Sequence, residues 1–134
     1  MQSNAKSKPL QKMLIVDDNG DLRKLLRLTF GYGKYQILEA DNGQTALNIA
    51  MEEKPDIMLL DIMMPGEIDG LRVCEMVKSS ENLKDCCVIM LTARGQREDF
   101  EKGEKAGADF YITKPFSPLE LIEIIERKRF DSVA

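Results

Sequence analysis

The stretch DIMLLD, residues 56–61, is an apolar run that begins and ends with an aspartate. Four further apolar runs occur along the chain, at residues 12–16, 35–38, 86–91 and 108–113. Segments with helical periodicity separate the runs, at about residues 20–30, 42–51, 70–79, 96–106 and 117–125. Short apolar runs that alternate with helices predict an α/β fold with a parallel sheet.

Polar residues suited to phosphoryl transfer follow four of the five runs. These residues are Asp17 and Asp18 after the first run, Asp61 after the third, Thr92 after the fourth and Lys114 after the fifth. Only the second run ends without such a residue, at Glu39. Because the carboxyl ends of parallel strands lie along one edge of a sheet, where ligands bind, we expect these side chains to share one cleft.

The bulk properties indicate a single globular domain. The chain has 134 residues and a net charge of −4, which argues against nucleic acid as a partner of its surface. No apolar stretch reaches the roughly 20 residues of a membrane-spanning helix. We expect residues 1–11 to form a flexible arm, residues 12–130 the domain and residues 131–134 a tail. The three cysteines, Cys74, Cys86 and Cys87, are expected to be reduced and buried.

The apolar faces of the helices follow from their periodicity. The inward residues are expected to be Leu22, Leu25, Leu26 and Thr29; Ala46, Leu47, Ala50 and Met51; Leu71, Cys74 and Val77; and Leu121, Ile122 and Ile125. The segment 96–106 has few apolar residues and carries Gly103 in its interior, which weakens a helix by about 1 kcal/mol relative to alanine. We expect it to be the least firmly held helix.

The carboxylates at the sheet edge are expected to bind a cation. Two carboxylates about 4 Å apart repel each other by roughly 4 kcal/mol at an effective dielectric constant of 20. Oxygen ligands of this kind suit Mg²⁺, and Lys114 would add a second positive charge. Taken singly, an Asp or Thr at this place is more often a helix cap and a lysine a surface charge. The combination of these residues at one edge of the sheet favours a cation-binding site.

Four motifs connect these residues to a known family. They are VDD at residues 16–18, LLDIMMPG at 59–66, LTA at 91–93 and GADFYITKPF at 107–116. With them the chain resembles, over about residues 12–129, the receiver domains of bacterial two-component response regulators. The resemblance implies a flavodoxin-like, doubly wound sheet of five parallel strands in the order 2-1-3-4-5, with five helices, in a cytoplasmic signalling protein that is not an enzyme.

The resemblance also implies roles for individual residues. Asp61 is implied to be the phosphoryl acceptor, and Thr92 and Lys114 to bind phosphoryl oxygens. The implied Mg²⁺ ligands are Asp17, Asp18, Asp61 and the backbone carbonyl of Met63. The peptide bond between Lys114 and Pro115 is implied to be cis. Thr92 and Tyr111 are the implied switch residues, which alter the surface formed by the helix at 96–106, the strand at 108–113 and the following helix.

The partners are implied by the same resemblance. Because the chain contains no histidine, a phosphohistidine donor has to act in trans, from a sensor histidine kinase or a histidine phosphotransfer protein. Asn19, Leu22 and Phe116 flank the expected cleft and are our candidates for its contact surface. Downstream, we expect a protein target or a covalently linked output domain, without direct nucleic acid or membrane binding, and a possible homodimer through the switch surface.

The same residues argue against several other functions. A haloacid dehalogenase-type phosphatase needs a second aspartate where Met63 stands. A flavin mononucleotide carrier needs a phosphate loop where residues 17–21, DDNGD, would repel phosphate. Calcium binding of the EF-hand type fails because Leu22 and Leu28 replace the required glycine and glutamate. A degenerate receiver that acts only as a protein scaffold stays open, although the complete acidic, hydroxyl and lysine set argues against it.

Overall fold

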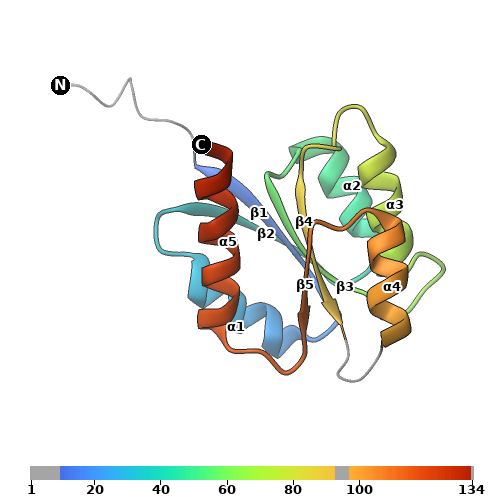
Figure 1. Cartoon of the computed structure of the whole chain (residues 1–134), viewed down its shortest axis with the longest axis horizontal. Helices are drawn as coiled ribbons and strands as arrows, with labels where there is room; N and C mark the ends of the chain where they lie inside the picture. The colour runs from blue at the N-terminus through green and yellow to red at the C-terminus, as the bar shows by residue number, and fades with distance from the viewer. Residues whose placement is uncertain (1–9, 93–96, 134) are drawn as a thin grey trace.

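The computed structural model describes residues 10–92 and 97–133. Five strands and five helices alternate along the chain (Figure 1). The strands are β1 (Gln11–Val16), β2 (Tyr35–Ala40), β3 (Ile57–Asp61), β4 (Cys87–Thr92) and β5 (Phe110–Thr113). The helices are α1 (Gly20–Phe30), α2 (Gly43–Glu53), α3 (Gly70–Ser79), α4 (Arg97–Ala106) and α5 (Pro118–Val133). The strands pair in parallel in the order β2-β1-β3-β4-β5, which confirms the predicted fold and strand order.

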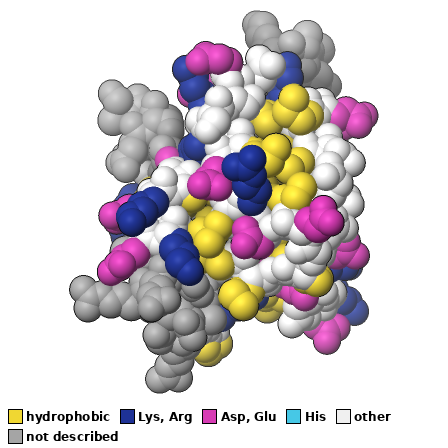
Figure 2. Space-filling model, turned by 90° about the vertical axis from the view of Figure 1, so that its right-hand side faces the viewer, with side chains coloured by type: hydrophobic (Ala, Val, Ile, Leu, Met, Phe, Trp, Pro, Cys, Tyr) yellow, Lys and Arg dark blue, Asp and Glu magenta, His cyan; other side chains and the backbone are white. Residues whose placement is uncertain are grey.

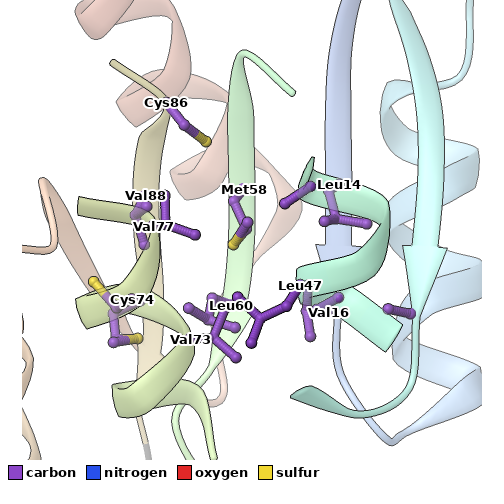
Figure 3. Packing of buried hydrophobic residues seen from close by; sticks show 14 of the residues in the cluster. Leu14, Val16, Leu47, Met58, Leu60, Val73, Cys74, Val77, Cys86 and Val88 are labelled. Carbon is purple, nitrogen blue, oxygen red and sulfur yellow. The ribbon is translucent and has the colours of Figure 1, made fainter. Parts of the chain in front are cut away.

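Helices cover both faces of the sheet. α1 and α5 lie on one side, and α2, α3 and α4 lie on the other (Figure 1). β3 is buried along its whole length, because strands in the middle of such a sheet contact helices on both faces. Alternate residues of β3 therefore enter different cores. Met58 and Leu60 point toward α2 and α3 (Figure 3). Leu59 belongs to the core on the side of α1 and α5.

Side-chain caps fix the helix starts. Asn42 accepts a hydrogen bond from the Thr45 amide at 2.9 Å, as its place before α2 predicts. Ser117 and Glu120 form a reciprocal capping box before α5, with both hydrogen bonds at 3.2 Å. The loop that carries Lys114 therefore leads into a helix with a defined start.

Two of the expected inward side chains are exposed. The buried stripe of α1 runs through Leu26 and Phe30, and this leaves Leu25 at its margin, 44% exposed. Met51 lies at the margin of the stripe of α2 and is 57% exposed, so both expectations were wrong. The other expected residues are buried or half-buried, and the three cysteines are buried and free, as predicted.

The first strand and the last helix can be compared with the domain boundaries expected from the sequence. β1 begins at Gln11 and α5 extends to Val133, so residues 131–133 continue this helix. Most of the expected N-terminal arm, residues 1–9, lies outside the described residues. Within the described part of the chain, none of the helices has the length and apolar character needed to cross a membrane. The domain boundaries stay predictions.

Candidate functional site

Buried polar side chains gather at one edge of the sheet. Among the described residues, the buried polar side chains are Asp17, Asp61 and Thr92, which are 0%, 6% and 4% exposed. They stand at the carboxyl ends of β1, β3 and β4, the three adjacent central strands. Burying a polar group without a partner is unfavourable, so a cluster of this kind points to a site that needs these groups.

Three carboxylates converge at this edge. One carboxylate oxygen from each of Asp17, Asp18 and Asp61 lies within 4.8 Å of the other two. Asp18 is exposed, which leaves the cluster open to solvent on one side. Oxygen donors at this spacing, with an open side for water, fit the preference of Mg²⁺ for a few carboxylates and several water ligands. These three residues could therefore hold the ion.

Lys114 reaches into the same cluster from the end of β5. Its Nζ donates a hydrogen bond to Asp17 Oδ2 at 2.9 Å and lies 3.5 Å from Asp61 Oδ2. Burial disfavours the charged ammonium, but the hydrogen bond with Asp17 and the charge of Asp61 outweigh it and raise the pKa of Lys114 above its ordinary value. The peptide bond between Lys114 and Pro115 is cis, as the resemblance implies.

Asp61 differs from an ordinary aspartate in its affinity for protons. Burial, and then the neighbouring charge of Asp17, raise its pKa from 3.8 to about 6. Lys114 and the Met63 amide, which donates to Asp61 Oδ1 at 3.2 Å, oppose this shift in part. The surroundings of Asp61 therefore disfavour its charged form, and a nearby cation would stabilise the charged carboxylate.

This shift predicts a pH dependence of stability in metal-free protein. Because the pKa of Asp61 is higher in the folded state, the folded state binds more protons between pH 3.8 and about 6. The contribution of Asp61 to the free energy of unfolding should fall as pH rises through this range, by at most about 3 kcal/mol, and stay low above it. Urea unfolding in the presence of a chelator, at pH values from 4 to 7, measures this change in the free energy of unfolding.

The Asp61→Asn variant provides the reference for that measurement, because all other titrating groups are shared. The stability of the variant relative to wild type should increase from pH 4 to pH 7. Parallel stability curves for the two proteins would contradict the raised pKa of Asp61.

Thr92 and Met63 complete the predicted set. Thr92 is the last residue of β4 and lies one position beyond Leu91, the register partner of Asp61. Its carbonyl accepts a hydrogen bond from the Lys114 amide at 2.7 Å, which ties the ends of β4 and β5 together. Met63 has an exposed side chain. The binding of metal by the Met63 carbonyl and of phosphoryl oxygen by Thr92 stay predictions.

The Tyr111 ring lies against α4, on the side of the core that contains α2 and α3. A Cβ atom at Gly103 would come within 2.7 Å of Tyr111 Cε1, so the glycine leaves room for the ring. Burial raises the pKa of the Tyr111 hydroxyl to about 12, with a smaller contribution from the charge of Glu104. The glycine that weakens α4 thus has a packing role, which its sequence context did not indicate.

The Gly103→Ala variant is expected to move the Tyr111 ring outward. The added methyl group takes the place of the ring edge, while alanine favours the helix by about 1 kcal/mol, so the protein should stay folded. With its burial reduced, Tyr111 should titrate closer to 10, the ordinary pKa of tyrosine. A spectrophotometric titration, with Tyr111→Phe identifying the band and exposed Lys102→Ala as a control, measures the change. A pKa that stays near 12 would show that the ring did not move.

The three candidate partner-contact residues lie near the site in different environments. Asn19 is exposed and caps α1, accepting hydrogen bonds from the amides of Asp21 and Leu22. The side chains of Leu22 and Phe116 are half-buried and pack against the core on the α1 and α5 side. Whether a partner contacts them stays a prediction.

Two residues behind the site were not predicted from the sequence. Arg23 on α1 donates from Nη1 to the Asp17 carbonyl at 2.7 Å, and its Nε donates to Glu39 Oε1 at 3.2 Å. Glu39 follows the only apolar run that ended without a residue of the expected kind. This exception was the one sign in the sequence that the end of the second run is different, and it did not point to Arg23.

Comparisons with known proteins agree with this arrangement. The family model described as response regulator receiver domain matches residues 13–126. The chain is 42% identical over 110 residues to the phosphate regulon transcriptional regulatory protein PhoB of Pseudomonas aeruginosa. It is 43% identical over 111 residues to the transcriptional regulatory protein ResD of Bacillus subtilis. These matches cover 82% and 83% of the chain but 48% and 45% of the relatives, so the chain spans about half of their length.

A solved structure supports the same assignment. A putative response regulator from Chloroflexus aurantiacus matches with a TM-score of 0.83 and 33% identity, over 89% of this chain and 97% of the other. Since the family model covers most of the chain and the strand order is the one expected, the sequence, fold and site agree. The chain belongs to the family of response regulator receiver domains.

Proposed function

We propose that the chain is a Mg²⁺-dependent phosphoacceptor, which takes a phosphoryl group onto Asp61 from a phosphohistidine of a sensor kinase or phosphotransfer protein. In this role it is a signalling phosphoprotein of the cytoplasm and not an enzyme with a separate substrate, since the chemistry is limited to its own phosphorylation and dephosphorylation. The family assignment supports the general role, and the geometry of the site supports the residues.

One observation carries the proposal. Lys114 Nζ lies 3.5 Å from Asp61 Oδ2, at the edge where Asp17, Asp18 and Asp61 bring their oxygens within 4.8 Å of one another. A carboxylate nucleophile, a cluster that can hold a divalent cation and a fixed ammonium are the groups that phosphoryl transfer to a carboxylate requires. Asp17, Asp18, Asp61 and Lys114 come together there from the ends of three strands, β1, β3 and β5.

The reaction follows from the charges of these groups. An Asp61 carboxylate oxygen forms a bond to phosphorus as the bond between phosphorus and the donor imidazole nitrogen breaks, and the donor histidine leaves without the phosphoryl group. Lys114 stands close enough to pair with a phosphoryl oxygen, and the Thr92 hydroxyl would donate to another. Bound Mg²⁺ would neutralise negative charge on both the carboxylates and the transferred group.

The proposed response lies on the side of α4, β5 and α5. Phosphorylated Asp61 would draw the Thr92 hydroxyl toward it, and Tyr111 next to Gly103 would respond to the change at the start of α4. An open groove of about 440 Å³ borders this surface, lined by residues of β5 and α5 that include Tyr111, Lys114 and Ile124. A downstream protein, a linked output domain or a second copy of the chain would bind there.

Nucleic acid is not part of this proposal. Figure 2 shows the face on the side of α3 and α4, where acidic and basic side chains alternate with small hydrophobic groups. A surface that binds nucleic acid needs positive charge gathered in one patch, and the net charge of the chain is −4. Any DNA binding by a longer protein would therefore belong to another domain.

Phosphorylation by a small-molecule donor tests the proposed function. Purified protein incubated with radiolabelled acetyl phosphate and Mg²⁺ should take up one phosphoryl group per chain, through a bond that survives acid and is lost in base. Omitting Mg²⁺ by chelation should stop the uptake. Uptake that is unaffected by a chelator would contradict the role of the carboxylate cluster, and no uptake from acetyl phosphate or from a phosphorylated kinase would contradict the phosphoacceptor function.

A further inference from the structure

Asp17 is held by hydrogen bonds at each of its polar groups. Its amide donates to the Ala40 carbonyl at 3.1 Å, and its Oδ1 accepts from the Asn19 amide at 2.9 Å. Lys114 Nζ bonds its Oδ2, and Arg23 Nη1 bonds its carbonyl oxygen. The Arg23 bond differs from the others because it holds the peptide unit that joins Asp17 to Asp18.

Asp18 depends on that peptide unit for its direction. It is exposed, and among the residues that the structure describes none donates a hydrogen bond to its carboxylate. Because a peptide unit is planar, fixing the Asp17 carbonyl also fixes the plane from which the Asp18 backbone continues. The hydrogen bond from Arg23 therefore constrains, through the main chain, the direction from which the Asp18 side chain approaches the cluster.

Arg23 is itself fixed by Glu39 at the end of β2. Arg23 Nε donates to Glu39 Oε1 at 3.2 Å, while Arg27 Nη1 donates to Glu39 Oε2 at 2.7 Å. The Arg23 and Glu39 side chains are only 22% and 27% exposed, which limits screening by water. Hydrogen bonds between charged groups are stronger than neutral ones, and the planar guanidinium bridges the two acceptors in a defined geometry.

We propose that Arg23, anchored by Glu39, is a positioning residue for the divalent cation site, because it holds the peptide unit between Asp17 and Asp18 so that the three carboxylates converge before the ion binds. The proposal rests on the Mg²⁺ site of the proposed function. It also gives Glu39, near the end of β2, a part in the site. Residues that orient metal ligands from outside typically change metal affinity by about 10- to 100-fold when they are replaced.

The sign of the effect separates positioning from simple electrostatics. Arg23 carries a positive charge next to a cation site, so removing that charge alone should strengthen cation binding. Loss of positioning should weaken it, because the ligands then have to be ordered when the ion binds. If cation affinity falls when this positive charge is removed, electrostatics alone does not explain the result.

The test measures Mn²⁺ binding by electron paramagnetic resonance, with Mg²⁺ as competitor, well below the melting temperature of each variant. Arg23→Met should raise the dissociation constant for Mn²⁺ about tenfold. Arg23→Lys, which keeps the charge but not the bridging geometry, should lie between this variant and wild type. Arg27→Met is the matched control: it removes the same charge from the same helix and a bond to the same Glu39, but among the described residues no hydrogen bond joins the Arg27 side chain to Asp17. Its affinity should stay within about twofold of wild type.

A double-mutant cycle tests whether Glu39 acts through Arg23. Glu39→Ala should weaken Mn²⁺ binding in the wild-type background and have little further effect in the Arg23→Met background. In metal-free protein, the Asn19 amide should exchange with solvent faster in Arg23→Met, since its acceptor Asp17 Oδ1 is less firmly held. Unchanged or tighter Mn²⁺ binding by Arg23→Met would overturn the positioning role. Failure of wild-type protein to bind Mn²⁺ or Mg²⁺ would instead contradict the proposed function.

Discussion

The Asp61→Asn variant is expected to take up no phosphoryl group from acetyl phosphate or from a phosphorylated kinase. The amide has no negative oxygen to attack phosphorus, and it removes one of the three carboxylates that would hold Mg²⁺. The shape of the side chain is kept. Because the pKa of Asp61 is raised, removing its negative charge should increase the free energy of unfolding at neutral pH. The variant should therefore stay folded, and at neutral pH without metal it should be more stable than wild type.

Asp69→Asn provides the matched control for this substitution. Asp69 is an exposed aspartate in the loop that follows β3, and it caps α3 by accepting a hydrogen bond from the Arg72 amide at 2.9 Å. Asparagine is an equally good cap, so this variant should be phosphorylated like wild type. Label that persists in folded Asp61→Asn would assign the acceptor to another residue. An Asp69→Asn variant that also lost its label would show that the assay responds to any change in this loop.

The convergence of the site was predictable because it follows from topology. In a parallel sheet with right-handed connections, the residues after β1, β3, β4 and β5 reach one edge whatever the details of packing. This is why Asp17, Asp61, Thr92 and Lys114 could be grouped from their places in the sequence. The helix starts were predictable for a similar reason, since the caps at Asn42 and Ser117 are local.

The features that the sequence did not indicate depend on contacts between distant segments. Arg23 and Glu39 are 16 residues apart, and nothing local marks them as a pair behind the Asp17 carbonyl. Leu25 and Met51 had the right spacing for an apolar face, but the width of that face is set by the neighbouring elements. Gly103 was predicted to weaken a helix, and its role in leaving room for Tyr111 depends on the packing of α4 against β5. Periodicity locates a face, and only the tertiary structure defines its limits.

The Gly70→Ala variant is expected to lose about 3 kcal/mol or more of stability, and with it the geometry of the site. Gly70 is the first residue of α3, and its amide donates to the Ile62 carbonyl at 3.0 Å. A Cβ atom there would overlap the Asp61 carbonyl oxygen and come within 2.8 Å of the Asp61 carbonyl carbon. These are backbone atoms at the end of β3, which is buried along its length, so they have little freedom to move. Urea unfolding gives the change in stability.

Gly20→Ala is the control that isolates this contact. Gly20 is also the first residue of a helix that follows a side-chain cap, but a Cβ atom there would meet only Arg23 Nη2, at an ordinary distance of 3.6 Å. Alanine at that place should leave stability unchanged or raise it, because it reduces the conformational freedom of the unfolded chain. If Gly70→Ala were as stable as Gly20→Ala, the close approach of α3 to Asp61 would not constrain the site. If it is much less stable, the glycine after the LLDIMMPG motif is required because it lets α3 begin directly against the backbone of the proposed phosphoacceptor.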